Sequence, residues 1–131
     1  MKLFHRTCLA VLVGFFAISG LTLAHHGTAI SYDRENPIRL EGTVTEWVWA
    51  NPHARLFFDV TGADGKVVNW GAETLSPGMF ARRGYDRSIF EVGDKVSLLM
   101  WPSRAGSPVG EIDWRESVFV DGEEILPIEE D

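Results

Sequence analysis

The chain is poor in cysteine and in positive charge. Its only cysteine is Cys8, so a disulfide framework within one chain is excluded and the fold must rest on core packing. Lysine and arginine together number 12, against 19 aspartates and glutamates, and the formal net charge is −7. Because binding to a phosphate backbone needs clustered positive charge, we expect no nucleic-acid partner.

The longest apolar run lies at the amino terminus and has the features of a secretory signal. Lys2 and Arg6 precede residues 8–23, which are apolar or small and fewer than the roughly 20 residues of a membrane-spanning helix. Thr22 and Ala24 are small residues at the positions that a signal peptidase reads. We therefore expect cleavage after Ala24, a periplasmic or secreted bacterial protein, and no stable membrane insertion after cleavage.

The chain after the signal has room for one small domain. We divide it into an extended amino-terminal segment, 25–38, a barrel, 39–122, and an acidic carboxyl-terminal tail, 123–131. The acidic residues of the tail are Glu123, Glu124, Glu129, Glu130 and Asp131. A short run of like charge at a terminus is typical of a solvated end, and we expect that here.

Five segments have the composition and alternation of strands. They are separated by turn residues and comprise 39–49, 54–61, 66–73, 95–101 and 113–120. Between the third and the fourth, Ser76 is a suitable cap, Pro77 a suitable first residue and Gly84 a suitable end for one short helix. This order predicts an all-β fold with one short helix, a small five-stranded OB-like Greek-key barrel.

Several aromatic residues fall out of phase with the aliphatic face of these strands. In the first strand Trp47 and Trp49 alternate with Val48, and Phe57 and Trp101 are out of phase in later strands. One interpretation is burial on both sides of a small, strongly curved barrel, which we favour. The other is an outer surface that stacks on a sugar, a peptide or a planar small molecule.

Histidine after the signal is limited to His25, His26 and His53. If cleavage follows Ala24, His25 offers one metal ion both its α-amine and its imidazole. Nitrogen-rich ligation suits Cu(II) or Ni(II), and affinity among divalent ions peaks at copper. We predict a copper site made by the His25 amine, the His25 ring and the His53 ring, with His26 as a substitute ligand. The alternative is that the terminal histidines are incidental and that His53 bonds a backbone carbonyl beside Pro52.

Other residues are candidates to complete such a site or to bind a different ligand. A metal-bound imidazole usually donates its second N–H to an oxygen, so polar side chains near the histidines are of interest. The candidates of this kind are Asn51, Tyr32, Asp33 and Glu73. For a ligand held by stacking, the candidates are Trp49 and Trp101.

Two resemblances bear on these predictions. The terminal-histidine arrangement is similar, in that one feature, to copper-dependent polysaccharide oxygenases and to some periplasmic copper carriers. A broader set of motifs spans nearly the whole chain after the signal: His25-His26, Tyr32-Asp33, Glu41-Gly42-Thr43-Val44, Trp49-Ala50-Asn51-Pro52-His53-Ala54, Trp70 with Glu73, the 77–84 helix and Gly93-Asp94-Lys95-Val96. These motifs resemble an exported bacterial family of unknown function, DUF6152. The resemblance implies export and the strand order, and it implies no activity.

Two functions follow as expectations. The first is an exported, non-catalytic binding protein that holds copper through His25 and His53. The second is a metal-free module that binds a small ligand or an envelope protein through aromatic residues on the outer barrel face. We expect no enzyme, because no cysteine nucleophile, serine elbow or phosphate-cradling loop is present after the signal. A copper-dependent oxidative enzyme is the remaining enzymatic alternative.

Overall fold

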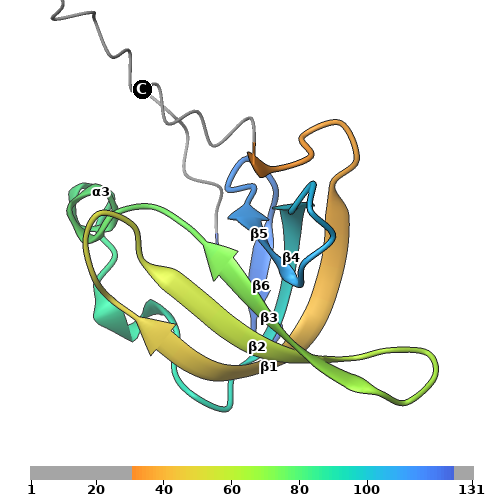
Figure 1. The fold of residues 1–131 in the computed structure, drawn as a ribbon. Coiled ribbons are helices and arrows are strands. Elements are labelled where there is room, and N and C mark those ends of the chain that lie inside the picture. Colours follow the sequence, from red (N-terminus) through yellow and green to blue (C-terminus); the bar gives the residue numbers. More distant parts are fainter. Residues whose placement is uncertain (1–30, 126–131) are drawn as a thin grey trace, which may run out of the picture.

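The structure, a computed structural model, describes residues 31–125 (Figure 1). The predicted signal, His25 and His26 therefore lie outside the described residues, as do 126–131. The elements are β1 (Ile38–Val48), β2 (Arg55–Thr61), β3 (Val67–Glu73), α3 (Pro77–Arg82), the 3-10 turn η1 (Arg87–Ile89), β4 (Lys95–Pro102), β5 (Val109–Ile112), β6 (Val118–Val120) and β7 (Glu123–Ile125).

Five of the strands close into a barrel. Their order is β1-β2-β3-β5-β4, and an additional pairing of β1 with β4 closes the sheet on itself. The β3–β5 pair is parallel and the other barrel pairs are antiparallel. The β6–β7 hairpin extends the sheet from β4. The prediction of an all-β, OB-like five-stranded barrel with one short helix is confirmed (Figure 1).

The helix forms for the reasons that the sequence indicates. The Ser76 hydroxyl accepts from the amide of Met79, a proline occupies the first turn, and Gly84 has the positive φ of 83° that favours glycine. The buried side chain of α3 is Phe80, which is 0% exposed and contacts aromatic rings from β1 and from the turn after β5. The helix therefore contributes an aromatic plug to the barrel core.

A bulge in β1 explains how its tryptophans, which are out of phase with the aliphatic residues in the sequence, come to face the core. The register with β2 shifts between Val44 and Glu46, so two residues of β1 oppose one of β2. Such a shift moves the side chains beyond it to the other face of the sheet. Trp47 and Trp49 consequently pack against the core, with the Trp47 ring centroid 5.0 Å from that of Phe90.

The last predicted strand is corrected. Residues 109–112 form β5, whereas 113–117 form a turn and 118–120 form β6. Gly110 lies between the fourth and the fifth predicted strands, and its missing side chain lets β5 pack closely against β4. The predicted acidic tail is corrected as well, because residues 123–125 form β7, which pairs with β6.

Candidate functional site

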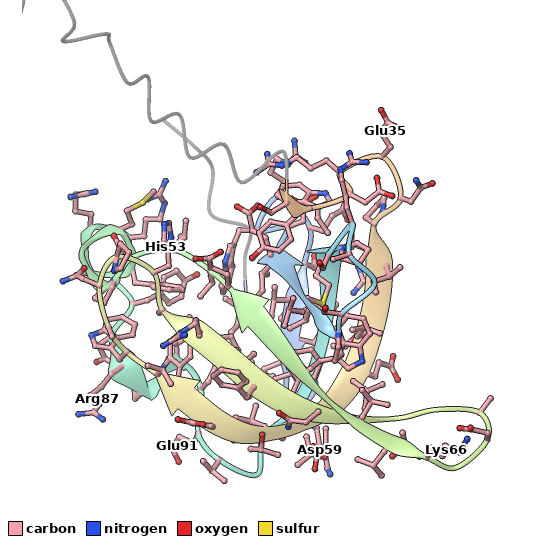
Figure 2. The ribbon with its side chains drawn as sticks, viewed as in Figure 1. Glu35, His53, Asp59, Lys66, Arg87 and Glu91 are labelled. Carbon is pink, nitrogen blue, oxygen red and sulfur yellow. The ribbon has the colours of Figure 1, made fainter. Side chains whose placement is uncertain are left out.

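His53 is held at the start of β2 by the backbone around it. The amide of Ala54 donates to the carbonyl of Leu75, and the amide of Thr74 donates to the carbonyl of Ala54, both at 3.0 Å. The imidazole Nδ1 lies 3.0 Å from the carbonyl oxygen of Thr74. Figure 2 shows His53 at the end of the β2–β3 hairpin opposite the turn that carries Lys66.

The hydrogen bond determines which ring nitrogen of His53 is available. A carbonyl oxygen only accepts, so Nδ1 carries the proton and Nε2 holds the lone pair when the ring is neutral. The residue is exposed. The alternative to metal binding by His53 was a hydrogen bond to a backbone carbonyl, and the structure has such a bond. Metal-bound imidazoles commonly make the same kind of bond through their second ring nitrogen. The arrangement therefore leaves Nε2 able to bind a metal ion.

Thr74 is itself fixed from the opposite side. Its side chain is buried, and its hydroxyl oxygen accepts from the indole Nε1 of Trp114, which is also buried. The carbonyl that orients His53 is thus part of a residue locked into the core. The turn after β5 supports the imidazole through Thr74.

Replacing the Thr74 hydroxyl tests this support. We expect Thr74→Val to lower the free energy of unfolding by about 1–3 kcal/mol, because the buried Trp114 N–H loses its acceptor. Urea denaturation measures the change. Thr45→Val is the matched control, because Thr45 is exposed and accepts from the exposed Asn69, and its expected cost is below about 0.5 kcal/mol. Equal costs for the two variants would contradict the assigned role of Thr74.

Two carboxylates lie side by side near His53. Glu73 of β3 and Glu111 of β5 are register partners in the parallel pair. Tyr32 donates to Glu73 at 2.9 Å, and Arg34 donates to Glu111 at 2.9 Å. The segment before β1 therefore reaches the β3–β5 edge at Glu73, the residue next to the carbonyl that orients His53.

Burial raises the pKa values of Glu111 and Tyr32 in this cluster. Desolvation by burial raises the pKa of Glu111, with the charges of Arg34 and of His53 acting in the opposite direction. Burial, followed by the hydrogen bond to Glu73, raises the pKa of Tyr32 above its ordinary value. Tyr32 is therefore a protonated donor at neutral pH.

A groove of about 310 Å³ lies over β2, β3 and β5. Gly71 and Gly110 are part of its lining, and Phe57 supplies an aromatic surface beside Gly71. The lining residues are Tyr32, Arg55, Phe57, Gly71, Ala72, Glu73, Val109 and Gly110. The groove therefore combines an apolar centre with charged groups of both signs.

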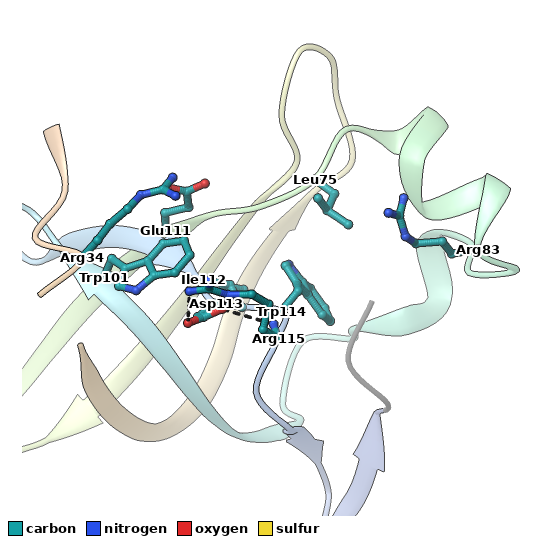
Figure 3. Close-up of a pocket in the computed structure, with 9 residues that line it drawn as sticks. All are labelled: Arg34, Leu75, Arg83, Trp101, Glu111, Ile112, Asp113, Trp114 and Arg115. Atoms are coloured by element: carbon teal, nitrogen blue, oxygen red, sulfur yellow. Dashed lines mark hydrogen bonds and ion pairs between the residues drawn. The ribbon is translucent and has the colours of Figure 1, made fainter. Parts of the chain in front are cut away.

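A second cavity, of about 90 Å³, is rich in arginine (Figure 3). Its lining comprises Arg34, Leu75, Arg83, Trp101, Glu111, Ile112, Asp113, Trp114 and Arg115, and we call it the arginine cavity. The guanidinium carbons of Arg34 and Arg115 lie 4.2 Å and 5.0 Å from the centroid of the Trp101 ring. Trp101 is 7% exposed, so the stacking surface predicted for it is already covered.

The structure brings together only part of the predicted site. His53, Glu73 and Tyr32 gather at one end of the β2–β3–β5 surface, whereas Trp49 is half-buried against the aromatic core. Asp33 accepts from Asn36 and from the backbone of the same turn. Asn51 is exposed. The preferred interpretation of the tryptophans, burial, is the one that the structure supports.

Sequence reasoning missed the arginines around Trp101. Arg34 precedes β1 and Arg115 follows β5, so no local spacing connects them. Only barrel closure brings both to one indole ring.

Within residues 31–125, no group of three or more histidine, cysteine, aspartate or glutamate side chains is placed to hold a metal ion. In the same part of the chain, no helix is long and apolar enough to cross a membrane.

Comparisons with known proteins give a family and a fold. A family model described as a family of unknown function, DUF6152, matches residues 14–112. No curated protein matches the chain. Among solved structures, the chain is similar to the mitochondrial single-stranded DNA-binding protein Rim1 from S. cerevisiae. The two are 8% identical over 65% of this chain and 92% of that one, with a TM-score of 0.45. This likeness concerns the fold alone.

Proposed function

The chain belongs to the DUF6152 family, whose function is unknown, and on that premise we propose that it is an exported, non-catalytic protein that binds Cu(II) through His25 and His53. The observation that carries the proposal is the bond between His53 Nδ1 and the carbonyl of Thr74. This bond fixes the ring and leaves Nε2 as the metal-binding atom. Metal-bound imidazoles commonly have such an oxygen partner at their other ring nitrogen.

The amino-terminal segment has the reach to deliver His25. Tyr32 is bonded to Glu73, adjacent to Thr74, so the chain already lies at the end of the barrel that carries His53. His25 lies seven positions before Tyr32, and an extended chain covers about 23 Å over that length. His25 and His53 can thus meet without rearrangement of the barrel.

The ligand chemistry favours copper. If the exported chain begins at His25, the α-amine and the two rings of His25 and His53 offer three nitrogens, a set suited to Cu(II). The carboxylates of Glu73 and Glu111 and the net charge of −7 make the surroundings attractive to a cation. His26 is the substitute nitrogen ligand.

A Cu(II) titration followed by electron paramagnetic resonance tests the proposal. We expect the protein beginning at His25 to bind one ion with nitrogen couplings. We expect a single leading glycine, or His53→Ala, to weaken binding at least tenfold, about 1.4 kcal/mol. The glycine-extended protein is the matched control, because it has the same barrel and the same histidines. Weak binding that responds to neither change would overturn the proposal.

Metal-free binding of a small ligand or an envelope protein is the second candidate, and the groove over β2, β3 and β5 favours it. Phe57 lines this groove, whereas Trp49 and Trp101, which the sequence suggested for stacking, are packed or covered. The copper titration separates the two candidates. If the groove is the binding site, His25→Ala and His53→Ala leave binding of the groove ligand unchanged. If copper is the ligand, the same two substitutions abolish Cu(II) binding.

A further inference from the structure

The arginine cavity has a charge that is unusual for this protein. Three guanidiniums and two carboxylates line it, so its lining has an excess of positive charge although the whole chain carries a net −7. Arg115 pairs with Asp113 at 2.9 Å, and Arg34 pairs with Glu111 at 2.9 Å. The third guanidinium is that of Arg83, at the end of α3 on the opposite side of the cavity (Figure 3).

The apolar part of the lining suits a peptide better than a lone ion. Leu75 and the indole of Trp114 lie between Arg83 and the Arg34–Trp101–Arg115 stack (Figure 3). A ligand with an aliphatic side chain followed by carboxylates would match this lining, because the side chain would meet the apolar residues and the carboxylates would meet the arginines. Guanidinium groups bind carboxylates with geometric specificity through paired N–H donors.

The direction of β7 at Ile125 is toward the side of the hairpin where this cavity lies. Because β6 and β7 are antiparallel and Val118 pairs with Ile125, a strand extended past Ile125 would run toward the residues that precede Val118. Those residues include Trp114 and Arg115, which line the cavity. Ser117, just before β6, also bonds Glu124 of β7 and holds the hairpin in this register.

We propose that the arginine cavity is a carboxylate-binding site whose occupant is the acidic carboxyl end of the same chain, residues 126–131. That segment reads Leu-Pro-Ile-Glu-Glu-Asp, with aliphatic residues before the acids. From Ile125, residues 129–131 lie within about 13–20 Å in an extended chain, whereas Arg115 is three residues from Val118 on the neighbouring strand. An extended acidic end is thus long enough to reach the arginines.

A tethered occupant has an advantage over a separate acidic partner. A linked segment of this length acts at a millimolar effective concentration, whereas a free acidic ligand is repelled by the net negative charge of the protein. Docking would also place the end of the chain over the Trp101 stack. An external acidic ligand would then have to displace it.

Paramagnetic relaxation measurements test the docking in the protein that begins at His25, which contains no cysteine. A nitroxide is attached through Asp131→Cys, leaving Glu129 and Glu130 in place. We expect severalfold loss of signal at the amides of Arg83 and Arg115 and at the Trp114 indole. We expect none at Lys66, in the distant β2–β3 turn.

Charge variants identify the contacts. Arg83→Glu should remove the paramagnetic signal loss, because it repels the acidic end. Combining it with Glu129→Lys and Glu130→Lys restores opposite charges, so the signal loss should return. Arg82→Glu is the matched control, because Arg82 is the exposed neighbour of Arg83 and does not line the cavity. If Arg83→Glu disturbs folding, Arg83→Gln replaces it. Raising salt to about 1 M, where the screening length is roughly 3 Å, should also weaken the effect.

Two outcomes would overturn the proposal. One is an absence of site-specific signal loss in the labelled protein, or a loss that Arg83→Glu and Arg82→Glu leave equally unchanged. The other concerns the signals of Arg83 and Trp114 when inorganic phosphate is added. The proposal is overturned if these signals change equally in the intact protein and in a variant with Glu129→Gln, Glu130→Gln and Asp131→Asn. That result would mean a general anion site that the tail does not occupy.

Discussion

Gly110→Ala is expected to lower the free energy of unfolding by about 3 kcal/mol or more. A Cβ at this position would lie 2.5 Å from the backbone carbonyl oxygen of Trp101 and would also collide with the methyl of Met100. The methionine can move, but the carbonyl belongs to β4 and cannot shift without breaking the pairing of Pro102 with Gly110. Urea denaturation followed by fluorescence measures the loss.

Gly78→Ala is the matched control for this variant. Gly78 lies in α3, and a Cβ there meets no atom within 4 Å. Alanine is favoured over glycine in a helix, so the expected change is a gain of up to about 0.5–1 kcal/mol. If Gly110→Ala were as well tolerated as Gly78→Ala, β5 would not lie against β4 as described.

The clash at Gly110 also bears on the candidate site. Glu111 follows directly and is the register partner of Glu73. A displaced β5 would separate these carboxylates and open the groove, of which Gly110 is part. Gly110 thus permits both the closure of the barrel and the placement of Glu73 and Glu111 near His53.

Phe80→Ala is expected to cost about 3–5 kcal/mol, the range for removal of a buried phenylalanine. Phe80 is 0% exposed, and its ring lies 5.4 Å from those of both Trp49 and Trp114. Removing it leaves a cavity among rings that cannot all collapse into the space. Urea denaturation gives the cost, and loss of near-ultraviolet circular dichroism reports the loosened aromatic packing.

The effect should extend to His53. Trp114 holds Thr74, and Thr74 orients the imidazole, so a loosened Trp114 weakens the support of the candidate ligand. Val92→Ala is the control, because Val92 is 72% exposed and its truncation should change stability by less than about 0.5 kcal/mol. A cost for Phe80→Ala below 1 kcal/mol would mean that α3 does not plug the barrel.

The barrel itself was predictable because its signals are local. Alternation marked the first four strands to within a residue or two, and Ser76, Pro77 and Gly84 marked the helix between the third and the fourth. The order of these elements allowed only a few topologies, of which the OB-like barrel is the one observed. Family membership agreed with the motifs that the chain carries.

The candidate site was predictable only in part. The scarcity of histidine singled out His53, and Tyr32 and Glu73 were named as polar neighbours before any contact between them was known. The bond to Thr74, the approach of Glu111 and the arginine cavity were not predictable, because the residues involved are separated by 21 to 77 positions. Their proximity depends on strand register, which local periodicity does not encode.

What the sequence alone determined is therefore the set of elements, their order and the few residues with metal-binding chemistry. Only the tertiary structure decided which face each residue occupies. The bulge after Val44 turned Trp47 and Trp49 into the core, and the parallel pairing of β3 with β5 placed Glu73 beside Glu111. The physical reason is that a strand repeats every two residues, so one inserted residue or one register step changes the neighbours of every side chain beyond it.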